Sequence, residues 1–341
     1  MIQSPDRCGI VELPVPAPAA GEVLVRSRFA GVCGTDVELW KGLVHEEMMA
    51  YPCIPGHEWS GTVESVGSGA GDLRPGDPVV VEGVQHCGRC RFCRQGDTNL
   101  CAHKTELGFT RPGGLSEYVV CSARTVHRLR EGVPLDHAAL IEPTAVVARG
   151  IRRARPEPGL CAAVIGPGTI GLLATSLLRL YSPRRLFLLG LTDASLALGA
   201  RLGATDTVQL RDPDALARVM EETDGLGVDL AVECAGQTSA VDTAFRVVRR
   251  GGKVVLMGAA GREAKMEMMS DLFHARDLEV HGVLSYNQAT WQDAVRLISD
   301  GMVPAGEIIQ RRFAFGQAAE ALAFLAGGTG VGKSLIHIAD G

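Results

Sequence analysis

The sequence predicts an α/β protein in which a β-rich domain is joined to a domain built on a doubly wound parallel sheet. Short β-branched runs separated by glycine and proline turns fill the chain up to about residue 146. From Cys161 onward, apolar strands alternate with helical stretches, as in a parallel sheet. The length of 341 residues is also typical of about two domains. We therefore place the β-rich domain at residues 1–146 and 280–341, and the parallel-sheet domain at 147–279.

The elements of the β-rich domain follow from its turns. The runs GEVLVRSRF, GTVESVG, DPVVVEG and LSEYVV each have the β-branched pattern of a short strand. The short amino terminus predicts a clipped first strand. After residue 280 come two helical stretches, WQDAVRLISDG and GQAAEALAFLAGG, and a final strand, SLIHI. We expect this tail to return to the first domain.

The parallel-sheet domain is predicted from four apolar runs of strand length, CAAVIG, RLFLLG, VDLAVECAG and GGKVVLMG. The helices predicted among them span 168–180, 194–202 and 239–248. The loop after the first strand, GPGTIG, holds Gly166, Gly168 and Gly171 in the G-x-G-x-x-G spacing. Because this loop joins a strand to a helix, we predict dinucleotide binding there rather than a plain glycine turn.

The contacts to the adenosine ribose are less defined. The second strand ends at Gly190, where an enzyme that uses NAD usually carries an acid for the ribose 2′-hydroxyl. Asp193, with Thr192 before it, is the nearest substitute, and no Arg or Lys follows Gly190 closely enough to hold a 2′-phosphate. NAD is therefore favoured over NADP, with NADP or dual use left open.

Composition and charge argue against other classes of protein. The net charge of −5 leaves no dominant basic face, so no nucleic-acid partner is expected. No apolar stretch approaches the roughly 20 residues of a membrane helix, and the amino terminus lacks the apolar core of a signal peptide. We therefore expect a cytoplasmic protein, in which ten cysteines indicate metal binding or catalysis rather than disulfides.

Four of the cysteines lie in one short lobe, residues 86–102. The run CGRCRFCRQGDTNLC spaces its thiolates so that one loop can surround a tetrahedral ion. Such a closed set leaves no open coordination position, so we predict a structural zinc held by Cys87, Cys90, Cys93 and Cys101. A nucleic-acid finger is disfavoured, because fingers need a longer gap between ligand pairs and a basic helix.

A second set of metal-type residues is spread along the chain: Cys33, His57, Glu58 and Glu142. Each alone is ordinary, since buried cysteines, core histidines and surface acids are common. Beside a dinucleotide loop, however, they fit an open zinc site that lowers the pKa of an alcohol whose hydride then passes to a nicotinamide. Thr35 offers a hydroxyl that could carry the proton away.

With these motifs, the chain resembles the zinc-dependent medium-chain dehydrogenase/reductase superfamily, in its polyol and threonine dehydrogenase branch. The resemblance runs nearly end to end. It is carried by GEVLVR, GVCGTD, PGHEWSGTVESVG, GDPVVVEG, GGLSEYVV, IEPTAVV, AAVIGPGTIG, LGARLGA, GVDLAVECAG and GGKVVLMG, together with the four-cysteine lobe. It implies a GroES-like catalytic domain, a Rossmann domain and an active site in the cleft between them.

The resemblance also implies roles for individual residues. Cys33 and His57 match ligands of the catalytic zinc. Glu58 and Glu142 match acids that bind this zinc directly or lie close to it, and Thr35 matches the hydroxyl of a proton relay. The lobe cysteines match the structural zinc, which makes two zinc ions per chain. The residues that match cofactor contacts are Gly166, Gly168, Thr169, Ile170, Gly171, Cys234, Ala235, Met257, Gly258, Ala259, Leu284 and Ser285.

Some positions depart from the family pattern. Glu38 stands where a relay histidine is often found, so we expect proton release through Glu38 or water. Gly190 replaces the usual acid and Ser195 a common arginine, which leaves the ribose contacts open. A run that matches the P-loop pattern, GGTGVGKS at 327–334, follows a helix and precedes a strand. A true P-loop has the reverse order, so ATP binding is not predicted.

These observations predict an enzyme that oxidises a secondary alcohol or reduces the corresponding ketone. A polar, acidic pocket is predicted from four acids, Asp36, Glu38, Glu58 and Glu142. It suits a polyol, cyclitol, sugar or amino sugar, and a role in amino-sugar or aminocyclitol biosynthesis is one hypothesis. The alternatives are an L-threonine-type amino-alcohol dehydrogenase and a non-catalytic relative that binds zinc and cofactor. A small molecule is the expected partner, and the resemblance implies a homo-oligomer, a tetramer before a dimer.

Overall fold

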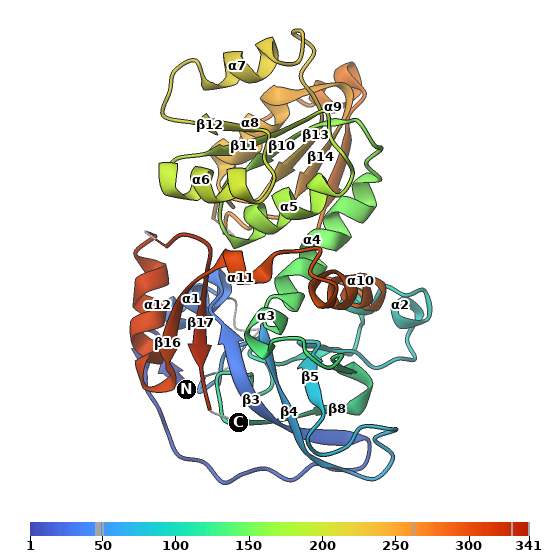
Figure 1. Cartoon of the computed structure of the whole chain (residues 1–341), viewed down its shortest axis with the longest axis vertical. Coiled ribbons are helices and arrows are strands. Elements are labelled where there is room, and N and C mark those ends of the chain that lie inside the picture. The colour runs from blue at the N-terminus through green and yellow to red at the C-terminus, as the bar shows by residue number, and fades with distance from the viewer. Residues whose placement is uncertain (45–48, 50, 262, 329, 340–341) are drawn as a thin grey trace. The chain divides into compact units, whose positions relative to one another are not determined.

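The computed structural model describes residues 1–44, 49, 51–261, 263–328 and 330–339. The chain divides into two compact units (Figure 1): Met1–Glu142 with Asn287–Gly341, and Pro143–Tyr286. One unit is rich in antiparallel strands and the other is built on a parallel sheet, so the predicted α/β class is confirmed.

The first unit is organised around a seven-stranded sheet. The order is β16-β17-β3-β4-β5-β9, and β8 also pairs with β3. These strands are β3 (Glu22–Gly31), β4 (Trp59–Val66), β5 (Pro78–Val81), β8 (Tyr118–Ser122), β9 (Val126–Arg128), β16 (Ile309–Ala314) and β17 (Lys333–His337). The last strand pairs antiparallel with β3, where Leu335 lies opposite Gly31. The carboxyl-terminal end of the chain thereby lies beside a strand from its beginning.

Shorter elements surround this sheet. Two small sheets pair β1 (Ile2–Ser4) with β2 (Arg7–Cys8) and β6 (Val84–Gln85) with β7 (Thr105–Glu106). The helices are α1 (Gly34–Lys41), α2 (Arg91–Arg94), α3 (Leu135–Ala138), α10 (Gln288–Ser299), α11 (Ala305–Ile308) and α12 (Ala318–Ala326), with short 3-10 turns at Thr98–Leu100, Ala123–Thr125 and Phe315–Gln317. Val25, Trp59 and Ile336 belong to the core that these elements enclose.

The second unit contains a six-stranded parallel sheet in the order β12-β11-β10-β13-β14-β15. The strands are β10 (Cys161–Ile165), β11 (Arg185–Gly190), β12 (Asp206–Gln209), β13 (Val228–Glu233), β14 (Val248–Leu256) and β15 (Glu279–Gly282). The order reverses between β10 and β13. In such sheets, dinucleotides bind outside the carboxyl ends of the strands at this reversal.

Helices cover both faces of the parallel sheet. In Figure 1, α5 and α6 lie on one face, and α7 and α8 on the other. The helices are α4 (Ile141–Ala154), which begins in the first unit, α5 (Thr169–Arg179), α6 (Asp193–Arg201), α7 (Ala215–Glu221), α8 (Thr238–Val247) and α9 (Leu272–Arg276). The three helices predicted in this part agree with α5, α6 and α8 to within one residue at each end. Every residue of β10 is buried, because helices pack on both sides.

The sheet extends beyond the predicted end of its domain. β15 pairs with β14, so that Val280 lies opposite Val254 and His281 opposite Val255. The predicted boundary between residues 279 and 280 therefore falls inside a strand. The sequence does not predict this strand, because it is short and partly exposed and its residues lack the continuous apolar run of the inner strands.

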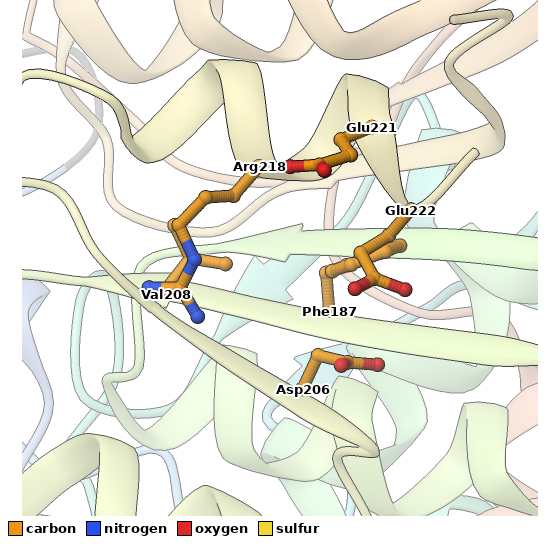
Figure 2. A pocket seen from close by; sticks show the side chains of 6 residues that line it. All are labelled: Phe187, Asp206, Val208, Arg218, Glu221 and Glu222. Carbon is orange, nitrogen blue, oxygen red and sulfur yellow. The ribbon is translucent and has the colours of Figure 1, made fainter. Parts of the chain in front are cut away.

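A small cavity of about 70 Å³ lies between β11, β12 and α7 (Figure 2). It is lined by Phe187, Asp206, Val208, Arg218, Glu221 and Glu222. Ligand pockets usually measure about 300–1,000 Å³, and Arg185 already pairs with both Asp206 and Glu222 at this place. The cavity is therefore a packing feature of the second unit. Among the described residues, no helix has the length and apolarity that crossing a membrane requires.

Candidate metal centres and dinucleotide loop

The four-cysteine lobe brings its sulfur atoms into one cluster. Cys90 is the N-cap of α2 and Cys93 lies within that helix. One ligand atom from each of the four cysteines lies within 4.8 Å of the others. The Sγ–Sγ distances are 3.5 Å for Cys90 and Cys93, 4.0 Å for Cys87 and Cys93, and 3.9 Å for Cys90 and Cys101.

These distances fit a zinc ion. Four sulfurs placed tetrahedrally at about 2.3 Å from one ion are separated by roughly 3.8 Å. The backbone N–H groups of Cys87 and His103 both donate to Cys101 Sγ, at 3.3 and 3.4 Å, so the loop itself holds this sulfur in place. The lobe thus has the donor set and spacing of a closed structural zinc site.

Cys33, His57 and Glu58 form a second cluster, again with ligand atoms within 4.8 Å of one another. Cys33 is the N-cap of α1, and the other two residues directly precede β4. His57 is 8% exposed and Glu58 is 2% exposed, whereas Cys33 is half-buried. One thiol, one imidazole and one carboxylate are three protein ligands, the number that leaves a tetrahedral zinc one open position.

Asp36 holds the first two members of this cluster in place. It is fully buried, and its Oδ1 lies 3.6 Å from His57 Nδ1. The backbone N–H of Cys33 donates to its Oδ2 at 2.9 Å, and that of Gly56 to its Oδ1 at 3.3 Å. Burial lowers the pKa of His57, but the Asp36 carboxylate and Cys33 together raise this pKa above its usual value. A carboxylate behind a metal-binding histidine orients the ring and raises its basicity.

Glu58 has a buried partner of its own. Its carboxylate forms an ion pair with Lys333 Nζ, and the Lys333 side chain is only 3% exposed. Burial lowers the pKa of Lys333, but the charges of Glu58 and Cys33 outweigh it and hold that pKa above its usual value. Gly31 makes room for the pair, because a Cβ at this position would lie 2.2 Å from Glu58 Oε2 and 2.6 Å from Lys333 Cε.

The other predicted members lie around this cluster in different ways. Glu142 is buried, but it is not among the residues whose ligand atoms meet within 4.8 Å. Burial, reinforced by the charge of Glu58, raises the pKa of Glu142 to about 8. The Cys33 thiol donates to Thr35 Oγ1 at 3.7 Å, so the predicted relay hydroxyl lies beside the thiol. Glu38 lies on α1, and burial raises its pKa.

The glycine loop has the geometry that a dinucleotide requires. Gly166 has φ +98°, and a Cβ there would lie 2.7 Å from that of Ala235. A Cβ on Gly171 would lie 1.9 Å from the Gly166 carbonyl oxygen, so this glycine allows close packing of α5 on the loop. Gly168, the N-cap of α5, faces open space, since a Cβ at this position would meet no atom within 4 Å. The loop therefore leaves a free approach at the helix N-terminus, where phosphates bind.

The remaining predicted cofactor residues lie at the ends of neighbouring strands or at the starts of helices. Thr169 and Ile170 form the first turn of α5. Gly190 ends β11, and Thr192 is the N-cap of α6, which begins at Asp193. The Asp193 carboxylate accepts a hydrogen bond from Gln209 Nε2 at 2.8 Å, and Thr192 Oγ1 donates to Ser195 Oγ at 2.8 Å.

Glu233 connects the ends of β13 and β14. Its buried carboxylate accepts hydrogen bonds from the backbone N–H groups of Ala235 and Gly236, both at 2.7 Å, and of Gly258 at 3.2 Å. Cys234 donates its backbone N–H to Ile165 at 2.9 Å. Met257, Gly258 and Ala259 directly follow β14, beside this network.

Leu284 and Ser285 follow β15 and are positioned from α4. Arg149 Nη1 donates to the Leu284 carbonyl oxygen at 2.7 Å, and Arg153 Nη1 donates to that of Gly282 at 2.6 Å. Ser285 has φ +55°, a backbone conformation that residues other than glycine rarely adopt. Leu284 is 57% exposed, so this segment has an apolar residue at the surface.

Sequence reasoning missed three groups that complete these sites: the Asp36 contact to His57, the Lys333 partner of Glu58, and the Glu233 network. Lys333 lies in the GGTGVGKS run, of which residue 329 is outside the described residues. The order of helix and strand around this run argued against ATP, but only the pairing of β17 with β3 reveals what the lysine does. A buried position for this lysine could have been suspected, since it begins an apolar final strand.

Two family models match the chain. Residues 19–131 match the alcohol dehydrogenase GroES-like domain, and residues 169–300 match the zinc-binding dehydrogenase domain. The first matched segment contains both candidate metal centres apart from Glu142 and Lys333. The second begins at Thr169, within the glycine loop.

Similar proteins match over almost the whole chain. A D-xylulose reductase A of Aspergillus niger is 32% identical over 326 residues, which cover 94% of this chain and 90% of that protein. A sorbitol dehydrogenase of Bacillus subtilis (strain 168) is 29% identical over 316 residues, covering 92% and 89%. Among solved structures, a protein of Sinorhizobium meliloti 1021 assigned as a zinc-binding dehydrogenase, bound to NADP, has a TM-score of 0.93 and 28% identity, covering 99% and 98%.

Proposed function

The chain belongs to the zinc-dependent medium-chain dehydrogenase/reductase superfamily, and from that premise we propose that it oxidises a secondary alcohol on a polyhydroxylated small molecule, with hydride transfer to NAD(P). The observation that carries the proposal is the cluster of Cys33, His57 and Glu58 in a chain that also has an open glycine loop. The first supplies an alcohol-binding metal centre and the second a cofactor site. Sorbitol dehydrogenase and D-xylulose reductase, to which the chain is similar, act on polyols or their ketoses by name.

The residues of the cluster have distinct tasks in this reaction. Cys33, His57 and Glu58 would hold zinc, and Asp36 would orient the imidazole through its contact with Nδ1. Zinc, when bound, lowers the pKa of an alcohol toward neutrality. Thr35 Oγ1 lies beside Cys33 Sγ and would accept the alcohol proton, passing it to water or to Glu38. The substrate thereby loses one proton and one hydride and becomes a ketone.

The dinucleotide loop supplies the acceptor of the hydride. The N–H groups at the start of α5 face the open side of Gly168 and would hold the pyrophosphate. The nicotinamide provides the redox chemistry. Glu233 keeps the backbone at Ala235 and Gly258 in fixed positions, and these residues border the same strand ends. We propose NAD as the preferred cofactor, since position 190 is followed by no nearby Lys or Arg for a 2′-phosphate.

The charge around the cluster bears on the substrate class. Asp36 is committed to His57, and Glu58 is paired with Lys333. Two of the four acids that predicted an acidic pocket are therefore paired inside the protein. Because burial also raises the pKa of Glu142 to about 8, Glu38 is the acid left to supply negative charge near pH 7. This favours a neutral polyol, cyclitol or sugar as the main substrate class. An amino sugar or aminocyclitol is the narrower proposal, and it rests on Glu38 alone.

The experiment follows absorbance of the reduced nicotinamide with purified protein, NAD or NADP, and a panel of polyols, cyclitols, amino sugars and L-threonine, each with and without a chelator. Chelator-sensitive reduction with polyols supports the proposal. A response confined to L-threonine would replace it with an amino-alcohol dehydrogenase. No turnover of any substrate, together with fewer than two zinc ions per chain by elemental analysis, would favour a non-catalytic relative.

The narrower substrate proposal needs a paired comparison. The same sugar is offered with an amino group and with a hydroxyl group in its place, and kcat/KM is measured for both. A preference for the amine that disappears in a Glu38→Gln variant would support an acidic subsite. Equal turnover of the two compounds would remove the amino-sugar proposal and leave the polyol proposal intact.

A further inference from the structure

The end of β11 has no room for a side chain. A Cβ built on Gly190 would lie 2.5 Å from Cγ and 2.7 Å from Cδ of Pro167, and 3.2 Å from a Cδ of Leu196. Real Cβ atoms do not approach other atoms within 3.0 Å. The obstacle is a proline ring in the glycine loop, which cannot swing away as a flexible side chain would, because it is closed onto its own backbone.

The backbone on both sides of this contact is fixed. Gly166 donates its N–H to the Leu189 carbonyl oxygen at 2.9 Å, which holds the start of the loop against the end of β11. Leu210 donates its N–H to the Gly190 carbonyl oxygen at 2.8 Å, which holds Gly190 in the ladder with β12. Neither partner can withdraw without breaking a hydrogen bond of the sheet.

We propose that Pro167 and Gly190 form a coupled pair that determines cofactor specificity, because the proline ring keeps an acid away from the position next to the adenosine ribose. This inference rests on the dinucleotide function proposed above. An acid at the end of this strand normally binds the ribose 2′-hydroxyl and repels a 2′-phosphate. With Gly190 in that place and the Asp193 carboxylate accepting from Gln209, the preference for NAD over NADP is weak, less than about tenfold in affinity.

A corollary distinguishes this pair from a simple missing acid. Introducing Asp at position 190 alone does not create NAD specificity, because the clash with Pro167 comes first. Replacing Pro167 by Ala removes Cγ and Cδ, the two atoms that obstruct the Cβ. Only the double variant Pro167→Ala/Gly190→Asp therefore has both the space and the charge.

The first test measures stability without cofactor, using Gly190→Ala, Pro167→Ala and the double variant. Overpacking predicts that Gly190→Ala lowers Tm by roughly 4 °C or more, and that Pro167→Ala restores most of this loss in the double variant. Gly282→Ala is the matched control, since Gly282 likewise ends a strand of the same sheet, a Cβ there meets nothing within 4 Å, and Tm should stay within about 1 °C of the unsubstituted protein. Equal losses from Gly190→Ala with and without Pro167 would overturn the coupling.

The second test measures dissociation constants for NADH and NADPH by fluorescence titration. In Pro167→Ala/Gly190→Asp, the ratio of NADPH to NADH dissociation constants should rise by about tenfold or more, because a hydrogen bond to a carboxylate is gained and a phosphate is repelled. Gly190→Asp alone should weaken both cofactors without that rise. A full rise in the single Gly190→Asp variant would overturn the steric argument.

The two proposals fail in different ways. If the unsubstituted protein binds neither NADH nor NADPH, the proposed dinucleotide function fails, while the Tm cycle still reports whether Pro167 and Gly190 are coupled. If it binds both cofactors but prefers one by more than about tenfold, dinucleotide binding stands and the absence of an acid at position 190 does not govern specificity.

Discussion

The two candidate metal centres of the first unit differ in how the chain builds them. In the lobe, all four ligands come from residues 87–101, and the sulfur atoms contact one another and backbone N–H groups. In the second cluster, three unlike ligands come from two segments, and each has a charged or polar partner behind it: Thr35 for Cys33, Asp36 for His57 and Lys333 for Glu58.

This difference distinguishes a structural metal centre from one at which substrate can bind and react. A closed set of thiolates needs no further adjustment once the ion is bound. A centre with an open position must keep its ligands oriented while substrate and protons exchange, and buried partners provide that orientation. The comparison therefore predicts that loss of a zinc ligand in the second cluster acts mainly on turnover, whereas loss of a buried charged partner behind that ligand also costs stability. Variants in the lobe should act mainly on stability.

The largest expected effect comes from the ligands of the second cluster. Cys33→Ser or His57→Ala should lower kcat by about a thousandfold or more, since metal polarisation of the alcohol contributes several kcal/mol. Tm should change little in Cys33→Ser, whereas His57→Ala also leaves the buried Asp36 carboxylate without its partner and should lower Tm. The measurement is steady-state turnover with zinc content determined on the same sample, and Cys8→Ser serves as a cysteine control outside both clusters. Substantial activity in a Cys33→Ser protein shown to lack that zinc would refute the assignment.

The next effect concerns the ion pair behind Glu58. Lys333→Met leaves a carboxylate buried without its partner, and removal of one member of such a pair costs about 3–5 kcal/mol. The free energy of unfolding is measured by denaturant titration. Adding Glu58→Gln to Lys333→Met should recover much of the loss, because the buried charge is then removed. A Lys333→Met protein as stable as the parent would mean that the ion pair does not contribute to the free energy of unfolding.

In the lobe, Cys93→Ser should lower Tm by roughly 5 °C, since a set of three thiolates binds zinc less tightly and the metal contributes folding energy. Turnover measured well below the new Tm should remain near that of the parent. Thermal unfolding with and without added zinc makes the measurement. Loss of turnover in a folded, stable Cys93→Ser protein would contradict the proposal that the lobe has only a structural role.

The smallest effect is expected from the residue behind His57. Asp36→Asn keeps the shape of the side chain but removes its charge, and changes of this kind typically reduce metal affinity or activity by about 10–100-fold. The zinc dissociation constant is determined by competition with a chelator, with Asp97→Asn in the lobe loop as a control. An unchanged zinc affinity in Asp36→Asn would mean that Asp36 does not orient His57.

Local motifs predicted the parts of the molecule that local chemistry determines. The lobe follows from cysteine spacing, and the glycine loop and the helices α5, α6 and α8 follow from glycine positions and apolar periodicity. What the sequence did not reveal depends on strand pairing. Lys333 reaches Glu58 because β17 pairs with β3, and Pro167 meets Gly190 because β10 and β11 run side by side.

Burial explains the other omissions. Acids near Cys33 predicted a charged pocket, but the structure turns Asp36 toward His57 and Glu58 toward Lys333, which no count of residue types reveals. Nothing in the apolar run that contains Glu233 indicates its role, although its carboxylate ties together two strand ends through backbone N–H groups. Polar groups inside a protein must be paired, and the partner is chosen by the fold.

The position of Lys333 in the last strand has a consequence for the order in which the protein matures. During synthesis the amino-terminal part emerges first, so the lobe has all four thiolates as soon as Cys101 has left the ribosome. The Glu58 carboxylate must wait for nearly the whole chain, because its counter-charge arrives with β17. The four thiolates of the lobe are thus available to zinc long before Lys333 is made, whereas the Glu58 carboxylate gains its ion pair only after β17 has been added.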